Sequence, residues 1–337
     1  MMPSSTPVER VGEKEPTAER AVEPPSAQGF TYLFGPVFSR RLGRSLGVDL
    51  LPYKTCSLDC IYCECGPTTH LTVKRSSLVP SDDVIAELDA YLGPRPLLDF
   101  VTFAGSGEPT LHAGLGCMIA HLKQHHPQYK VAVLTNGTLF SSEESRRDVL
   151  SADLVIPSLD GATPESFQAI NRPASGVTVE KVIEGLRSLR RDYQGTYVLE
   201  IFIVPGINDT DREVVALRHA AERIQPNAIQ LNRLDRPGIL PSIRPASDEL
   251  LASIRTRLEP LTVFVVPRRQ SGAIRRVDDS EIEAAILGRL TGRSVDTTTL
   301  SFLLGLHEGL AWISTEGRFP KREVFWAGCA ASDRCAG

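Results

Sequence analysis

Four of the seven cysteines fall within ten consecutive positions. Three of them, Cys56, Cys60 and Cys63, have the spacing CxxxCxxC, and Cys65 follows closely. Thiolates are soft ligands that favour iron–sulfur clusters or zinc over hard cations. A structural zinc site takes four protein ligands, usually from paired CxxC motifs, whereas three thiolates on one loop suit a four-iron cluster with one iron left open to bind a substrate. Zinc completed by Cys65 or His70 stays as the alternative.

The other three cysteines indicate no second site. Cys117 falls in an expected helix, and we expect it to be buried, because free cysteine is among the most buried residue types. Cys329 and Cys335 alone supply too few ligands for a metal site. Seven unevenly placed cysteines do not form the disulfide framework of a small secreted protein. We therefore expect a reducing compartment in which the cysteine loop holds metal.

The composition is that of a soluble globular protein, with 42% hydrophobic residues, 23% charged residues and a formal net charge of −4. That charge gives no overall attraction to nucleic acid or to acidic membranes. No stretch approaches the roughly 18 uninterrupted apolar residues of a membrane span. Residues 1–30 lack the cationic start and apolar run of a signal peptide. We expect a cytoplasmic protein with no membrane partner.

The chain divides into four expected parts. Residues 1–29 are rich in Pro, Glu, Ser and Ala, which predicts a disordered leader because such a segment buries too little apolar surface to offset its ordering entropy. Residues 30–270 are expected to form one α/β domain. Residues 271–327 combine helical patterns with a hairpin-like GRFPKREVFW and predict a small winged-helix-like module, which would bind nucleic acid or peptide or cap the main domain. Residues 328–337 are expected to be a flexible tail.

The central domain alternates apolar runs with helical patterns. Six mostly apolar runs read as strands buried on both faces of a parallel sheet, and they occupy residues 45–50, 99–104, 129–136, 153–160, 197–206 and 228–234. Helices are expected to begin at the polar capping segments 80–83, 141–143 and 209–211, and a further apolar strand at 261–267. Six right-handed βα units predict a partial (β/α)6 TIM-like barrel, with its chemistry at the carboxyl ends of the strands.

The loops that follow these strands are rich in glycine and polar residues. They are the cysteine loop after the first strand, GSGEPTLH after the second, NG after the third, SLDG after the fourth and PGIND after the fifth. Any one of them could be ordinary turn chemistry. Because the carboxyl ends of the strands meet at one end of a barrel, five such loops in register predict one site there.

The cysteine spacing, with Tyr62 directly before the last cysteine, resembles the signature of the radical S-adenosylmethionine (radical SAM) superfamily, and the similarity extends over most of residues 30–240. The resemblance implies catalysis by a [4Fe-4S] cluster that Cys56, Cys60 and Cys63 hold. Its open iron would chelate S-adenosylmethionine, which an electron then cleaves to methionine and a 5′-deoxyadenosyl radical. It also implies an external electron donor of the flavodoxin or ferredoxin type.

The resemblance assigns cofactor-binding roles to the first two loops. Tyr62 would lie near the adenine of S-adenosylmethionine. The segment GSGEP is similar to the GGEP motif of the superfamily, whose backbone meets the methionine amino group, although the first glycine of that motif is a serine here. The residues of this segment that would contact the cofactor are Ser106, Gly107, Glu108 and Pro109.

Later loops carry further elements that resemble the superfamily. Ser158 and Asp160, with Arg172, look like the elements that hold the ribose hydroxyls and the methionine carboxylate, and the planar guanidinium of arginine suits a carboxylate. Val204 opens a VPG segment similar to the one that packs against adenine. Asn232 follows on the sixth strand, from which it could reach the cofactor.

Within the superfamily, the segments FGPVFSRRLGRSLGVDLLPYKTCSLDCIYC and QLNRLDRP look most like the branch of tRNA wyosine synthase and its uncharacterised relatives. The chain departs from wyosine synthases because no cysteine precedes Cys56 to hold a second cluster, and because a winged-helix-like tail is added. Branch membership does not establish that reaction. The substrate is therefore left open as a peptide, an RNA or a small molecule.

Two other functions compete with this interpretation. One is a zinc-dependent nucleic-acid-binding regulator, in which the cysteines hold zinc. The other, an electron-transfer protein, would leave the SGEP and SLD loops unexplained. Lys54, just before the cysteines, could tune a cluster or lie in a solvated loop. His121, His125 and His126 fall at the end of a predicted helix, where positive charge suits the helix dipole, and indicate no site.

Overall fold

The structure is a computed structural model, and it describes residues 26–268 of the chain. The expected winged-helix-like module at 271–327 and the expected tail at 328–337 lie outside the described residues. So do residues 1–25 of the expected leader. From the end of that leader, Ala27 is buried, and its amide nitrogen donates a hydrogen bond to the carbonyl oxygen of Gly35.

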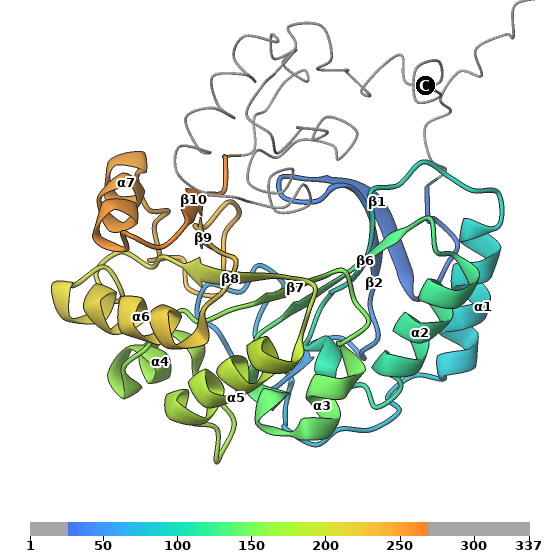
Figure 1. The fold of residues 1–337 in the computed structure, drawn as a ribbon, viewed down its shortest axis with the longest axis horizontal. Coiled ribbons are helices and arrows are strands. Elements are labelled where there is room, and N and C mark those ends of the chain that lie inside the picture. Colours follow the sequence, from blue (N-terminus) through green and yellow to red (C-terminus); the bar gives the residue numbers. More distant parts are fainter. Residues whose placement is uncertain (1–25, 269–337) are drawn as a thin grey trace, which may run out of the picture.

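An eight-stranded sheet forms the centre of the described residues (Figure 1). In spatial order its strands are β1 (Leu33–Ser39), β2 (Gly43–Val48), β5 (Phe100–Phe103), β6 (Lys130–Thr135), β7 (Leu154–Pro157), β8 (Thr196–Phe202), β9 (Ala228–Asn232) and β10 (Val263–Val265). All neighbours from β2 to β10 are parallel. The six predicted barrel strands and the strand predicted at 261–267 are thereby confirmed.

The edge strand β1 is antiparallel to β2, and the sequence did not predict it. Its segment LFGPVFS contains Gly35 and Pro36, and the pairing register shifts between Phe34 and Val37. Proline is compatible with a strand at a sheet edge, where the amide hydrogen it lacks is not needed by a neighbour. The irregularity hides the alternation of side chains from which a strand is normally predicted.

The helices follow the strands along the chain and lie on the outside of the curved sheet (Figure 1). They are α1 (Ser81–Leu92), α2 (Leu115–His125), α3 (Glu143–Asp148), α4 (Pro164–Asn171), α5 (Val179–Asp192), α6 (Asp211–Ile224) and α7 (Asp248–Arg257), with short 3₁₀ helices at Pro109–Leu111 and Thr138–Ser141. Helix α6 begins where predicted, because the Thr210 side chain accepts a hydrogen bond from the Glu213 amide. No described helix is long and apolar enough to cross a membrane.

Successive strand residues face opposite sides of the sheet and form two separate apolar clusters. One cluster contains the strand residues Val101 and Val133 together with Leu88 of α1 and Leu115 of α2; its strand residues are odd-numbered from β5 onward and even-numbered in β2. The alternate strand residues face the barrel interior and form their own cluster, which includes Phe100, Ala132, Leu154, Val198 and Ala228. Both faces of the sheet are therefore buried, which confirms the partial (β/α) barrel.

Cys117 is exposed on α2, so the prediction that it is buried was wrong. The residues of this helix that face the core are Leu115, Met118, Ile119 and Leu122. They recur at the spacing of one helical face, and a residue two positions after Leu115 points away from that face. The position on the helix outweighs the usual preference of free cysteine for burial.

Candidate cofactor site

The cysteine loop follows the carboxyl end of β2. Cys56 ends a short strand, β3 (Thr55–Cys56), which pairs with β4 (His70–Leu71). The amide of Thr72 donates to the Cys56 carbonyl at 2.9 Å, and the amide of Cys63 donates to the Cys60 carbonyl at 3.0 Å. All three cysteines of the CxxxCxxC motif are partly buried. Local backbone pairing thus fixes where the thiols lie.

The end of α4 supports the other side of this loop. The Asp59 amide donates to the Asn171 carbonyl at 2.9 Å, and the Ile61 amide donates to the Ile170 carbonyl at the same distance. Leu58 also forms a bridge with Pro173. The loops after the first and fourth barrel strands, far apart in the sequence, therefore form one surface, as their common end of the barrel predicts.

Each of the three motif sulfurs lies near one nitrogen donor. The pairs are Lys54 Nζ and Cys63 Sγ at 3.0 Å, Asn171 Nδ2 and Cys60 Sγ at 3.3 Å, and Asn136 Nδ2 and Cys56 Sγ at 3.5 Å. Lys54 is buried and adopts a left-handed backbone (φ 55°), a strained conformation of the kind found at functional sites. The sequence did not indicate either asparagine individually; the NG turn was the only signal for Asn136.

The sulfurs are too far apart to hold one zinc ion. Among the residues that the structure describes, groups of three metal-ligand atoms that all lie within 4.8 Å of one another occur only at Asp89, His121 and His126. A tetrahedral zinc site with bonds of about 2.3 Å would bring its sulfurs to within roughly 3.8 Å. The three thiols as they lie are not a site for a single zinc ion, and the zinc alternative is not supported.

The thiols differ in how readily they ionise. A hydrogen bond from the Cys65 thiol lowers the pKa of Cys63, against the effect of burial, and Lys54 lowers it further. Burial raises the pKa of Cys56 to about 11 and also raises that of Cys60. Cys63 is therefore the thiol most ready to ionise, and the other two lose their protons when metal binds.

The GSGEP loop approaches the backbone of the cysteine loop closely. A Cβ atom added at Gly107 would lie 2.0 Å from the carbonyl oxygen of Thr55, so only glycine fits. The amide of Glu108 donates to the same oxygen at 3.2 Å, and the amide of Ser106 donates to Asp49 Oδ2 at 2.9 Å. The loop after β5 is thus held directly against the loop that carries the thiols.

The buried side chain of Glu108 joins the loops after β5 and β6. Its Oε1 accepts hydrogen bonds from Thr110 and from Thr135 Oγ1, and its Oε2 accepts one from the Asn136 amide at 2.7 Å. Burial raises the pKa of this carboxyl, although the hydrogen bonds oppose the shift. Pro109, also buried, begins the 3₁₀ helix that continues the loop. The Glu108 carboxylate therefore positions Asn136, which in turn contacts Cys56.

Asp160 is the buried centre of a second group of contacts. Its Oδ2 accepts hydrogen bonds from Tyr62 Oη at 2.6 Å and from Asn171 Nδ2 at 2.8 Å, and its Oδ1 accepts one from the Phe202 amide at 2.9 Å. Burial raises the pKa of Asp160 to about 6. The Tyr62 ring stacks on Phe202, with ring centroids 3.8 Å apart. Asp160 therefore orients the aromatic ring beside Cys63 and the amide that contacts Cys60.

Three further residues that the sequence assigned to cofactor binding, Arg172, Val204 and Ser158, lie near the loops of the site. Arg172 directly follows α4, with its guanidinium 3.9 Å from Asp59 and 43% of its side chain exposed. Val204 is buried in an apolar group with Ile61. Ser158, just after β7, forms a bridge with Glu200.

Polar side chains lie on the inner face of the barrel, near the carboxyl ends of the strands. Glu200 Oε2 accepts hydrogen bonds from Asn232 Nδ2 at 3.2 Å and from Gln230, and it forms an ion pair with Arg41. The Gln230 Oε1 is buried without a hydrogen-bond partner among the described residues. Glu200 was not predicted as a site residue, although a carboxylate inside the apolar strand TYVLEIF is a usable signal.

The chain matches the Radical SAM superfamily over residues 50–218. A UPF0026 protein of Synechocystis sp. is 35% identical over 210 residues, which cover 62% of this chain and 77% of that protein. A UPF0026 protein of Methanocaldococcus jannaschii is 32% identical over 226 residues, 66% of this chain and 70% of that protein. A protein named GTPase Obg, of Brachyspira hyodysenteriae, is 41% identical over 199 residues, but the chain covers only 29% of its length.

Among solved structures, the chain resembles a radical SAM methyltransferase from Sphaerobacter thermophilus with a TM-score of 0.53. The two sequences are 16% identical, and the match covers 69% of this chain and 67% of that one. At this identity the likeness shows a shared fold, which agrees with the partial barrel described above.

Proposed function

The chain belongs to the radical SAM superfamily, among the UPF0026 proteins, and from this premise we propose that it is an enzyme that cleaves S-adenosylmethionine reductively. Members of the superfamily use a [4Fe-4S] cluster, which when bound supplies the electron that breaks S-adenosylmethionine into methionine and a 5′-deoxyadenosyl radical. One observation carries the proposal: three thiols on one loop each have a nitrogen donor, and their sulfurs are spaced too widely for a single ion.

Residues of this chain are well placed to bind such a cluster. Cys56, Cys60 and Cys63 would be its ligands. The Lys54 ammonium and the Asn171 amide donate hydrogen bonds to ligand sulfurs, and such donors stabilise the more negative, reduced form of an iron–sulfur cluster. The Lys54 charge also offsets the negative charge that the thiolates would bring into a partly buried site.

S-adenosylmethionine is proposed to bind beside the cysteine loop. The backbone of Ser106, Gly107, Glu108 and Pro109 lies against that loop and would meet the methionine moiety. The exposed part of the Arg172 side chain would turn from Asp59 to the methionine carboxylate, because a guanidinium binds a carboxylate through two parallel hydrogen bonds. Tyr62 and Val204 would form the apolar wall for adenine. Asp160 would act through the side chains that it orients.

The inner polar surface is proposed to face the substrate. The polar side chains near the carboxyl ends of the strands are those of Ser158, Glu200, Gln230 and Asn232. The apolar cluster of the barrel interior lies deeper in the barrel. This apolar cluster would keep water from the region where a radical would form. A peptide, an RNA and a small molecule all remain substrate classes within the proposal. The wyosine-synthase branch also remains a prediction, since the names of the UPF0026 relatives state no substrate.

The proposal includes an external one-electron donor of the flavodoxin or ferredoxin type, because reductive cleavage of S-adenosylmethionine consumes one electron that the cluster must regain. It also places the protein in the cytoplasm, because thiols that are to bind iron must stay reduced.

Cleavage of S-adenosylmethionine tests the proposal directly. The protein would be reconstituted anaerobically with iron and sulfide, analysed for about four of each per chain, reduced with dithionite and incubated with S-adenosylmethionine. We expect 5′-deoxyadenosine and methionine in equal amounts by mass spectrometry. Fully loaded protein that forms neither product would refute the proposal. Stoichiometric zinc after anaerobic purification, without iron or sulfide and lost when Cys56, Cys60 and Cys63 are replaced, would favour the regulator instead.

The replacement Lys54→Met should make the cluster harder to reduce. A hydrogen bond to a charged group contributes about 1.5–3 kcal/mol, and 59 mV corresponds to a tenfold change for one electron. We expect a reduction potential at least about 60 mV more negative than that of the unmodified protein, measured by redox titration with electron paramagnetic resonance. The exposed Lys74→Met is the matched control. Equal potentials for Lys54→Met and the unmodified protein would show that Lys54 does not act on the cluster.

A further inference from the structure

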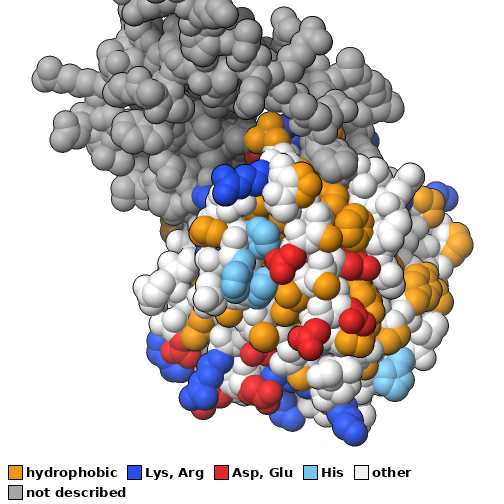
Figure 2. Space-filling view, turned by 90° about the vertical axis from the view of Figure 1, so that its right-hand side faces the viewer, with side chains coloured by type: hydrophobic (Ala, Val, Ile, Leu, Met, Phe, Trp, Pro, Cys, Tyr) orange, Lys and Arg blue, Asp and Glu red, His pale blue; other side chains and the backbone are white. Residues whose placement is uncertain are grey.

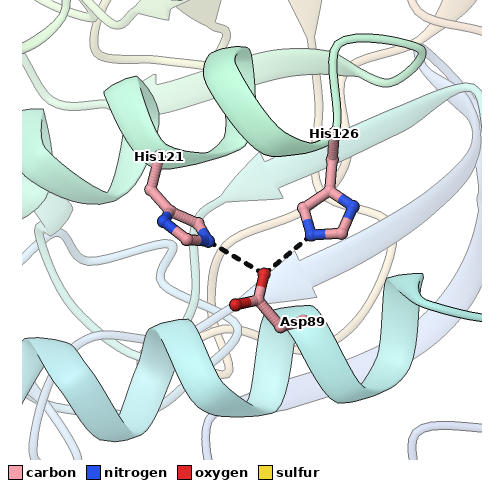
Figure 3. A group of neighbouring side chains, drawn as sticks. All are labelled: Asp89, His121 and His126. Carbon is pink, nitrogen blue, oxygen red and sulfur yellow. Dashed lines mark hydrogen bonds and ion pairs between the residues drawn. The ribbon is translucent and has the colours of Figure 1, made fainter.

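Helices α1 and α2 lie next to each other on the outside of the barrel (Figure 1), and one carboxylate and two imidazoles meet between them. Asp89 belongs to α1, His121 to the last turns of α2, and His126 follows the end of α2. The Nε2 atoms of His121 and His126 lie 2.8 and 2.7 Å from the same oxygen, Asp89 Oδ1 (Figure 3). All three ligand atoms lie within 4.8 Å of one another.

We propose that Asp89, His121 and His126 form a binding site for a divalent transition-metal ion of the zinc class, separate from the cysteine site. Imidazole nitrogen and carboxylate oxygen are ligands that zinc takes, and three protein ligands leave a fourth position for water or another ligand. The same set is unsuited to magnesium or calcium, which prefer oxygen ligands throughout. The proposal stands independently of the radical chemistry.

The two distances to the Asp89 oxygen require only a small adjustment to admit the ion. Bonds of about 2.0–2.1 Å in a tetrahedral site separate the ligand atoms by roughly 3.3 Å. The Asp89 oxygen therefore has to withdraw from each imidazole by about half an ångström. Its side chain is 46% exposed, so it can move into solvent, whereas the side chains of His121 and His126 are 17% and 12% exposed and stay in place.

Packing holds the two imidazoles in position. His125 stacks on His121 with ring centroids 4.2 Å apart, and its Nδ1 lies 3.0 Å from the His121 carbonyl oxygen. The His126 amide donates to the Leu122 carbonyl at 2.8 Å, and Leu122 itself is fully buried. Because the ligands are already ordered, little conformational entropy is lost when a metal binds.

The surroundings favour a cation and give it access. Figure 2 looks onto the side of the molecule where α1 and α2 lie and shows histidine side chains gathered beside acidic ones at the surface. Burial opposes ionisation of Asp89, but the hydrogen bonds from His121 and His126 outweigh it, and the pKa of Asp89 is lowered. The carboxylate is therefore ionised at neutral pH, and a bound metal would take the place of the Nε2 protons, which would pass to the Nδ1 atoms or to solvent.

A metal at this position would join the two helices that follow the cofactor loops. Helix α1 comes after the cysteine loop, and α2 comes after the GSGEP loop. Since an ion that binds only the folded chain stabilises it by mass action, zinc should raise the melting temperature of the protein. The side chains of Asp89 and His121 reach across from different helices, so neither helix alone could form the site.

Titration with zinc tests the site. Zinc would be added to anaerobic, cluster-loaded protein and followed by isothermal calorimetry, with His121→Ala, His126→Ala and Asp89→Asn beside the unmodified chain. Loss of an outer partner of a metal ligand alone costs about 10–100-fold in affinity. We therefore expect each variant to bind zinc at least about 100-fold more weakly. His219→Ala, an exposed histidine of α6, is the matched control and should bind as the unmodified chain does.

A second measurement separates loss of the site from loss of the fold. Melting temperatures in a chelator should be similar for all the variants, and added zinc should raise those of the unmodified chain and His219→Ala only. Zinc affinity in His121→Ala and His126→Ala equal to that of the unmodified chain would overturn the proposal, and so would an unmodified chain that takes up no zinc. Because the probe is zinc alone, neither result depends on whether S-adenosylmethionine is cleaved.

Discussion

Replacing Cys56, Cys60 or Cys63 by alanine should reduce the iron content from about four per chain to almost none and abolish formation of 5′-deoxyadenosine. The three thiols are the ligand set that the site offers, and two thiolates on a short loop do not hold a cluster that takes one cysteine at each protein-bound iron. We expect cleavage to fall by more than about 100-fold, beyond the cost of losing an outer partner alone. Iron and sulfide analysis and mass spectrometry of the nucleoside measure both effects.

Two other cysteines serve as controls for these variants. Cys117→Ala removes an exposed thiol from α2 and should change neither quantity. Cys65→Ala removes the thiol that forms a hydrogen bond with Cys63. We expect the iron to be retained, because the three motif sulfurs remain. A Cys65→Ala protein without iron would instead make Cys65 a ligand. A Cys60→Ala protein with full iron and full activity would refute the site.

The replacement Gly107→Ala should disrupt the same site without removing any ligand. The added methyl carbon would lie 2.0 Å from the Thr55 carbonyl oxygen and 2.6 Å from Leu51 Cδ1, so the loops have to separate. Overpacking of this kind costs about 1–3 kcal/mol, and a shift of about 1 Å in a catalytic group can cost on the order of 100-fold in rate. We expect a lower melting temperature and a loss of cleavage of roughly that size.

Gly176→Ala provides the comparison. Gly176 has a left-handed backbone (φ +82°) but nothing within 4 Å of an added Cβ, so its replacement introduces backbone strain without crowding. That variant should lose some stability and keep its iron and its activity per loaded cluster. If Gly107→Ala behaved in the same way, close approach of the two loops would not matter for the site.

The sequence was sufficient for the parts of the molecule that depend on local pattern. Apolar runs predicted the six barrel strands, and the thiol spacing predicted the loop at the end of β2. The edge strand β1 was missed because Gly35 and Pro36 interrupt its alternation. Cys117 was placed in the core because residue type was weighed above helical position.

The direction in which each side chain points could not be predicted. Glu108 and Asp160 belong to motifs near the site, yet their carboxylates accept hydrogen bonds from protein groups and position other side chains. Asn136 lies 80 residues from Cys56 in the chain, and Asn171 lies 111 residues from Cys60. Contacts over such separations arise from tertiary packing, which residue spacing within a motif does not report.

The three nitrogen donors at the sulfurs also bear on how the protein matures. They come from the cysteine loop itself and from the third and fourth βα units, so the complete set exists only after the chain from Lys54 to Asn171 has assembled. A cluster inserted during synthesis would enter a site with one donor of the three. The first four βα units must therefore assemble before the cluster acquires its final electronic environment, and its spectrum would report that step of folding.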